Sequence, residues 1–220
     1  MAENQLSEIT EKILKCEACH LKDSRTKIVP GIYGPVNGLC IIGEAPGYYE
    51  DQQGIPFVGR SGKLLDNMLA DIGMKREEDV SILNIIKCRP TTSEGKNRTP
   101  NETELRFCGE RWLIKQLRML SPKLIVTIGK IPLSFFMPSA TSISKYVKNS
   151  YDTDLGFKIY VSYHPAYILR NYNLMELYSE HFVDIKKLYD KLLNDPGIDQ
   201  PKKKVVGSHG EQKSLTDYFG

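Results

Sequence analysis

The sequence predicts an α/β protein with a central parallel sheet of four strands and helices on both of its faces. The first observation is that short apolar runs, typical of buried strands, recur along the chain. The second is that longer stretches between them repeat apolar residues every three or four positions, which is the spacing of a helix that packs on one side. Strands that alternate with helices in this way favour a parallel sheet covered on both faces.

The first half of the chain contains two predicted helices and two predicted strands. Apolar residues recur at helical spacing over residues 6–14, before a loop with several Gly and Pro residues. An apolar run at 39–42 predicts the first strand. A helical pattern at 64–72 then leads to a second strand at 80–86.

The second half continues the same alternation. Pro100 and Asn101 mark the start of a long predicted helix that extends to about residue 117. Apolar runs at 124–128 and 159–161 predict the last two strands, and a helical repeat at 174–193 predicts the last helix.

Residues 1–195 are therefore expected to form one globular domain, and residues 196–220 a flexible tail. After Asn194 the sequence changes to Pro, Gly, Lys and Ser with few apolar residues. A compact core cannot form from such a stretch. The length of 220 residues suits one domain with a short appendage.

The composition excludes several classes of protein. A hydrophobic content of 40% with 26% charged residues is that of a soluble globular chain and excludes disorder throughout. No apolar run reaches the roughly 18–20 residues that span a bilayer, and the polar start lacks the features of a signal peptide. We therefore expect a cytoplasmic protein with no membrane partner. A net charge of +3 does not by itself indicate a polyanion ligand.

Polar and glycine-rich motifs follow three of the predicted strands. GEAPG begins at Gly43, Asn84 lies at the end of the second strand, and His164 stands before a proline after the last. Ligands of such folds bind beyond the carboxyl ends of the strands, where these residues would meet. The alternatives are an ordinary Gly/Pro turn and a structural histidine.

Four of the five cysteines suit a metal site. Cys16 and Cys19 are separated by two residues, and Cys88 and Cys108 lie far downstream. In a reducing compartment four such thiols indicate tetrahedral zinc or an iron–sulfur cluster. Burial in the core is the alternative for the two downstream thiols, as we expect for Cys40, which lies within an apolar strand.

Four motifs, taken together, resemble the family 4 uracil-DNA glycosylases. They are GEAPG at 43–47, GIPFVGRSGKLLD at 54–66, NIIKCRP at 84–90 and YHPAYILR at 163–170, in the order of that family. The resemblance spans residues 5–193. It implies the three-layer fold of those enzymes, hydrolysis of the N-glycosidic bond of uracil in DNA, and one [4Fe-4S] cluster bound by Cys16, Cys19, Cys88 and Cys108. It also implies a nucleoid-associated monomer.

The resemblance assigns roles in a pocket for an extruded base. Asn84 matches the residue that reads the Watson–Crick edge of uracil, and Phe57 matches the aromatic ring on which the base stacks. His164 matches the catalytic histidine, which donates to uracil O2 as the anionic base departs. The expected uracil-binding residues are Gly43, Glu44, Ala45, Phe57, Asn84 and His164.

The group that activates water is not assigned by the resemblance. Another family of uracil glycosylases has an aspartate where this chain has Ala45. Glu44, Glu50 and Asp51 are the neighbouring carboxylates, and we expect Glu44 or Glu50 to take part in catalysis.

Basic residues indicate where DNA would lie. The segment 87–118 contains twice as many basic as acidic residues. We expect Arg170, Arg89 and Arg98 to contact phosphate groups. The alternatives are a solvated helix face of mixed charge and, for Arg170, a surface salt bridge.

The C-terminal residues resemble a peptide that docks on sliding clamps of the proliferating cell nuclear antigen type. In residues 212–219 a short helical turn would place the leucine and two aromatic rings on one face. A random aromatic terminus is the alternative. The expected clamp-binding residues are Gln212, Leu215, Tyr218 and Phe219.

Two other functions fit parts of the sequence. One is a uracil-binding protein that captures its product through a histidine in a basic loop, but residues 91–101 contain no histidine. The other is a clamp-tethered uracil- or DNA-binding module without turnover. The combination of Asn84, Phe57 and His164 favours the enzyme, since a simple binding module needs no pocket for an extruded base.

Overall fold

A computed structural model describes the backbone of residues 2–194. The expected tail at 196–220, with its proposed clamp-binding peptide, lies outside the described residues. In the described part of the chain no helix is long and apolar enough to cross a membrane.

A five-stranded sheet forms the centre of the fold, in the order β2-β1-β3-β5-β4. The four strands β1 (Leu39–Gly43), β2 (Val80–Asn84), β3 (Leu124–Ile128) and β5 (Lys158–Ser162) are parallel, as predicted. The fifth strand, β4 (Ser150–Asp152), pairs antiparallel with β5 at the edge. It has three residues and no apolar run, so the hydrophobic pattern could not predict it.

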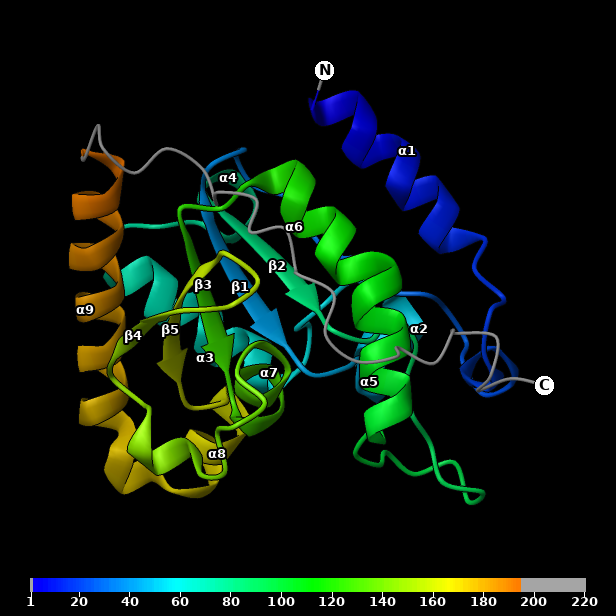
Figure 1. Cartoon of the computed structure of the whole chain (residues 1–220). Coiled ribbons are helices and arrows are strands. Elements are labelled where there is room, and N and C mark those ends of the chain that lie inside the picture. Colours follow the sequence, from blue (N-terminus) through cyan, green and yellow to red (C-terminus); the bar gives the residue numbers. More distant parts are fainter. Residues whose placement is uncertain (1, 195–220) are drawn as a thin grey trace.

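Helices cover both faces of the sheet (Figure 1). The helices α3 and α9 pack on one face, while α6 and α7 lie on the other and α1 packs against α6. The helices are α1 (Ala2–Leu14), α2 (Tyr48–Gln53), α3 (Arg60–Asp71), α4 (Arg76–Asp79), α5 (Glu102–Cys108), α6 (Ile114–Leu120), α7 (Lys130–Phe136), α8 (Pro165–Arg170) and α9 (Met175–Leu193).

Two apolar cores hold these layers together. On one side, Leu65 and Leu69 of α3 meet Tyr178 and Phe182 of α9, and all four side chains are almost fully buried. On the other side, α1, α6 and α7 enclose the opposite face of the same strands. Burial of a large apolar side chain stabilises a fold by about 1.5–3 kcal/mol, so these layers fix the sheet that supports the loops at its ends.

The predicted helix at 101–117 is helical throughout, but it is not a uniform α-helix. A π-helical segment, η2 (Gly109–Leu113), joins α5 to α6. A Cβ atom on Gly109 would lie 2.3 Å from the ring of Phe135, so only glycine permits this close approach of the helix to α7.

The register of the sheet places the ends of β1 and β2 side by side. Gly43 is the direct partner of Asn84, and the next backbone N–H group, that of Ile85, donates to the Gly43 carbonyl. On the other side of β3, strand β5 ends at Ser162, two residues before His164. The sheet thus brings the polar motifs together at the carboxyl ends of its parallel strands.

Candidate active site

Gly43 allows two functional side chains to meet at the end of β1. A Cβ atom at this position would lie 2.3 Å from Asn84 Oδ1 and 2.6 Å from Phe57 Cζ. Both distances are shorter than any real contact between such atoms. The absence of a side chain at Gly43 is therefore what lets the Asn84 amide and the Phe57 ring lie together.

The side chain of Asn84 carries a buried acceptor that the protein does not satisfy. The residue is 3% exposed, and its Oδ1 atom has no hydrogen-bond partner among the described residues. Leaving such an atom unpaired costs about 1–3 kcal/mol. An unpaired buried acceptor at the carboxyl end of a strand in a parallel sheet is suited to a ligand that brings an N–H group.

Phe57 is held in a backbone conformation that few side chains adopt. Its φ angle is 54°, in the left-handed region, and only 7% of the residue is exposed. The guanidinium of Arg76 donates to the carbonyls of Pro56 (2.7 Å) and Phe57 (2.8 Å). An ion pair of 2.6 Å between Arg76 and Asp66 orients that guanidinium. Arg76 thereby fixes the loop that presents the Phe57 ring.

His164 is a neutral hydrogen-bond donor. Its Nδ1 atom accepts from the backbone N–H of Ala166 (3.0 Å), so the proton of the neutral ring is on Nε2. Burial is the main cause that lowers the pKa of His164 to about 4, the positive charge of Arg170 contributes to the same shift, and Glu50 opposes it. The ring centre lies 5.8 Å from that of Phe57. His164 Nε2–H is thus available to a ligand beside Phe57 at neutral pH.

The three neighbouring carboxylates have different surroundings. Glu50 accepts from the backbone N–H groups of Gly47, Val58 and Gly59, at 3.0–3.2 Å. Asp51 is buried and accepts from the backbone of residues 26 and 27. Both therefore hold loops in place. Glu44 is partly buried, and burial raises its pKa. A role for Glu44 in activating water stays a prediction.

Known proteins match most of this chain. Residues 30–192 fit the family model of the uracil DNA glycosylase superfamily. The chain is 38% identical over 193 residues to the type-4 uracil-DNA glycosylase of Archaeoglobus fulgidus, which covers 84% of this chain and 94% of that one. It is 41% identical over 164 residues to the type-4 enzyme of Thermotoga maritima, covering 74% and 82%. For that of Sulfurisphaera tokodaii the identity is 37% over 193 residues, covering 84% and 85%.

The chain belongs to the uracil-DNA glycosylase superfamily. The match begins before β1 and ends within α9, so it includes all five strands and the loops that carry Gly43, Phe57, Asn84 and His164. The family match therefore includes the residues of the site described above.

The four predicted metal ligands of this superfamily member come from separate segments. Cys16 and Cys19 lie between α1 and the 3₁₀ turn η1 (His20–Asp23), Cys88 follows β2, and Cys108 ends α5. Each thiol is close enough to another for their charges to interact. Within the described residues, however, no three His, Cys, Asp or Glu side chains form a group that could hold a metal ion.

Two of the four sulfur atoms accept hydrogen bonds from side-chain N–H groups. The indole of Trp112 donates to Cys16 (3.4 Å), and the guanidinium of Arg25 donates to Cys88 (3.5 Å). The backbone of residues 21 and 87 opposes the rise that burial causes in the pKa of Cys19 and Cys108. Such N–H groups stabilise negative charge on sulfur.

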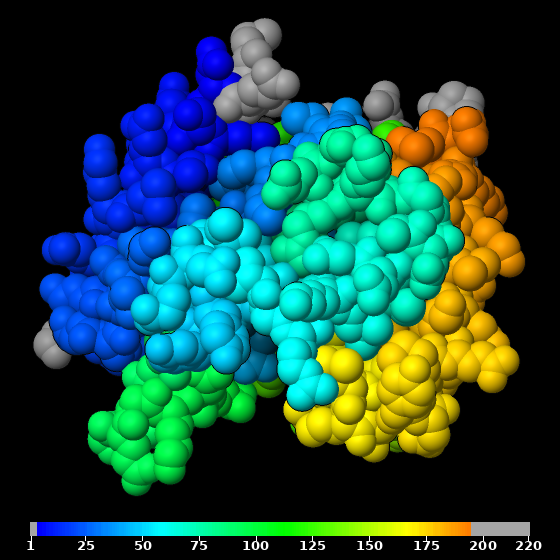
Figure 2. All heavy atoms as spheres, turned by 180° about the vertical axis from the view of Figure 1, so that it is seen from behind, coloured from blue at the N-terminus to red at the C-terminus, as the bar shows by residue number. Residues whose placement is uncertain are grey.

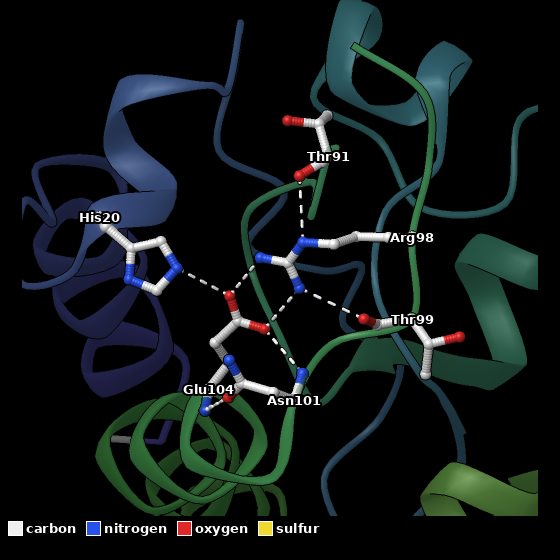
Figure 3. A network of polar contacts seen from close by, with 6 residues as sticks. All are labelled: His20, Thr91, Arg98, Thr99, Asn101 and Glu104. Atoms are coloured by element: carbon white, nitrogen blue, oxygen red, sulfur yellow. Dashed lines mark hydrogen bonds and ion pairs between the residues drawn. The ribbon is translucent and has the colours of Figure 1, made fainter. Parts of the chain in front are cut away.

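A buried carboxylate joins the segments that carry the cysteines (Figure 3). Glu104 is 5% exposed and accepts from both arms of the Arg98 guanidinium, from the backbone of Asn101 and from His20. Burial alone would raise the pKa of Glu104, but these donors outweigh it and lower the pKa to about 2. Arg98 also donates to the carbonyl of Thr91, so the network anchors the loop before α5.

Two of the three arginines expected on DNA have partners within the protein. Arg98 is bound to Glu104, and Arg89 donates to Asn97 (2.5 Å) and stacks over the ring of Tyr48. Their contact with phosphate stays a prediction. In the structure both guanidinium groups bind residues of the loop at 91–99 and hold that loop in place. Figure 2 shows this green segment projecting from the body of the protein. Arg170 is exposed and close enough to lower the pKa of His164.

None of the sequence motifs contains Arg76. It lies at the start of α4, in a polar stretch outside every motif, and it acts through backbone carbonyls. Such contacts leave no residue pattern in the sequence, so no signal could have identified it.

Replacing Arg76 by Met should lower kcat/KM on uracil-containing DNA by about 10–100-fold, because stacking on a base is worth about 1–3 kcal/mol and Phe57 would lose its support. Single-turnover kinetics measure the loss of activity, and circular dichroism shows whether the variant is folded. Arg76→Lys should recover part of the loss, and Lys75→Met, at an exposed neighbour, should have none. Unchanged kinetics in a folded Arg76→Met protein would contradict this role.

Proposed function

We propose that the protein is a uracil-DNA glycosylase. It hydrolyses the N-glycosidic bond between uracil and deoxyribose in DNA, leaving an abasic site and free uracil. The observation that carries this proposal is the unpaired Oδ1 atom of Asn84, which is buried beside the Phe57 ring and within the same site as His164. The type-4 uracil-DNA glycosylases that match most of the chain support it.

Recognition follows from the amide of Asn84. Uracil presents an N–H donor at N3 and an acceptor at O4, so Oδ1 can accept from N3 while the amide NH₂ donates to O4. Cytosine has an acceptor at N3 and a donor at its exocyclic amine. It would leave buried groups unpaired on both sides, which is the kind of mismatch that gives strong discrimination.

Bond cleavage is helped by charge stabilisation. As the bond between the base and the sugar breaks, negative charge develops on the uracil ring and positive charge on the sugar. The Nε2–H group of His164 is oriented by the Ala166 N–H before the substrate arrives, and it can donate to uracil O2. Glu44 can orient water toward the sugar. Stacking on Phe57 keeps the extruded base in place.

The test is to incubate the protein with single- and double-stranded oligonucleotides that contain one uracil, cytosine or thymine. We expect alkali-labile sites and free uracil from the uracil strands alone. A tightly bound but uncleaved uracil strand would contradict the enzyme and favour a binding module without turnover.

We further propose one [4Fe-4S] cluster bound by Cys16, Cys19, Cys88 and Cys108. The mutual proximity of these thiols and the side-chain N–H groups at Cys16 and Cys88 support it. A single tetrahedral zinc ion brings its ligands much closer together than a four-iron cluster, which binds each thiolate at a different iron. When bound, the cluster would join the segments around these residues into one rigid unit.

The cluster proposal predicts the metal content of the purified protein. Protein prepared without oxygen should contain about four iron atoms per chain and absorb broadly in the visible range. Cys108→Ser should lower both, whereas Cys40→Ser, at a buried cysteine of β1, should leave the iron content unchanged. A colourless protein containing zinc would contradict the cluster.

We also propose that residues 212–219 bind a sliding clamp. The spacing of Gln212, Leu215, Tyr218 and Phe219 supports this. Tethering raises the local concentration of an enzyme on its substrate. Removal of residues 211–220 should abolish binding to a clamp, measured by surface plasmon resonance, and leave excision from short oligonucleotides unchanged. Equal clamp binding by the two proteins would contradict the assignment.

A further inference from the structure

The side chain of Lys87 is buried between the cysteines and the candidate uracil site. Lys87 is 2% exposed, and its Nζ atom donates to the backbone carbonyl of Asn84 at 2.7 Å. A buried ammonium group costs several kcal/mol unless an opposite charge compensates it. The side chains that oppose the effect of burial on the pKa of Lys87 are those of Cys108 and Cys40.

The backbone of Lys87 ties the same residue to its surroundings. Its backbone lies close enough to Cys108 to act on the pKa of that thiol, and its carbonyl accepts from the backbone N–H of Val29 (2.8 Å). The next residue is Cys88. Lys87 thus joins Cys88 to Asn84, because it precedes Cys88 in the chain and its side chain binds the Asn84 carbonyl, so a displacement of Cys88 would reach Asn84 through a single residue.

The position of the Asn84 main chain determines where its amide lies. The amide packs directly against the backbone of β1, because Asn84 Oδ1 lies only 2.3 Å from where a Cβ atom of Gly43 would be. A shift of a few tenths of an ångström in the Asn84 carbonyl would therefore move the amide relative to the Phe57 ring.

We propose that Lys87 couples the four-cysteine site to base recognition: its main chain continues into Cys88, and its side chain holds the Asn84 main chain in the orientation that reads uracil. Lys87 is a positioning residue and does not touch the base. The inference rests on the proposed glycosylase function and on the proposed cluster. It goes beyond both, because it predicts that occupancy of one site changes the affinity of the other.

The coupling is tested by its reciprocity. If the cluster favours uracil binding, uracil must stabilise the cluster by the same factor. Iron loss from the wild-type protein is followed by visible absorbance in excess chelator, with saturating free uracil or with cytosine. We expect saturating uracil to raise the chelator concentration needed to remove half of the iron by a factor that reflects a change of at least about fivefold in the equilibrium constant, the lower end of typical coupling between sites, and cytosine to have no effect.

The variants localise the effect. In Lys87→Met, which keeps the length of the side chain but not its charge or N–H groups, uracil should no longer protect the iron. Lys191→Met, at an exposed position of α9, should behave as the wild type. If Lys87→Met does not fold, the dissociation constant of uracil is compared between the iron-loaded and iron-free wild-type protein, and it should rise at least about fivefold on iron removal.

The possible results separate the proposals. Uracil binding is measured independently by equilibrium dialysis. Binding without protection of the iron in the wild type, or equal protection in Lys87→Met, would overturn the coupling and leave the glycosylase function intact. Failure of the wild type to bind uracil, together with failure to excise it, would instead overturn the proposed function.

Discussion

Replacing Asn84 by Asp should lower kcat/KM for uracil excision by about 10⁴-fold, the discrimination expected when a site built to hydrogen-bond a substrate loses its match. The change removes the NH₂ donor and places a carboxylate oxygen against uracil O4, so two acceptors face each other in a buried site. The loss should arise mainly from weaker binding of the extruded base in the pocket. Single-turnover excision from a uracil-containing oligonucleotide measures it.

Stability provides the control for this variant. Because Asn84 Oδ1 has no partner in the free protein, Asn84→Leu should not lower the free energy of unfolding, although it should abolish activity. A urea titration followed by circular dichroism gives that free energy. If both variants keep wild-type kinetics, Asn84 does not read the base, whereas a large loss of stability in Asn84→Leu would mean that its amide serves the fold.

The sequence could predict the sheet and the residues at its ends. The four parallel strands are short, continuous apolar runs, and buried strands of parallel sheets have that pattern. Gly43, Asn84 and His164 follow such runs directly, so the topology alone brings them to one edge. The missed strand β4 is an edge strand with exposed residues and has no such pattern.

Residues that act through the main chain could not be predicted. Arg76 and Lys87 both donate to carbonyl oxygens, and every residue has a carbonyl, so their partners carry no identity in the sequence. Glu50 shows the same limit in reverse. A carboxylate beside a catalytic motif predicted a role in chemistry, but its three contacts are backbone N–H groups. A catalytic role for Glu50 stays a prediction.

His164→Ala should lower kcat by about 100–1000-fold with little change in KM, which is the effect of removing one donor from a developing negative charge. The loss should be the same at every pH where the wild type keeps its neutral ring. Since the pKa of His164 is about 4, the wild-type rate should show no limb due to this residue between about pH 5.5 and 8. Single-turnover rates across that range measure both effects.

Arg170→Gln tests the cause of the lowered pKa. Burial lowers the pKa of His164, and the positive charge of Arg170 adds to that effect. Removing the charge should raise the pKa, so the fall of kcat in acid should begin at a higher pH than in the wild type. An unshifted acid limb would show that Arg170 does not act on His164, and a wild-type limb near pH 6.5 would show that the ring is not buried as described.

Acid also acts on the fold, and its effect must be measured beside the rates. His164 and His181 both have a pKa of about 4 in the folded protein because burial disfavours their charged forms, while an unfolded histidine has a pKa near 6.5. The unfolded chain therefore takes up protons first as the pH falls. The free energy of unfolding should decrease from about pH 6.5 toward pH 4, and a rate that falls only in parallel with the folded fraction would not report on protonation at the active site.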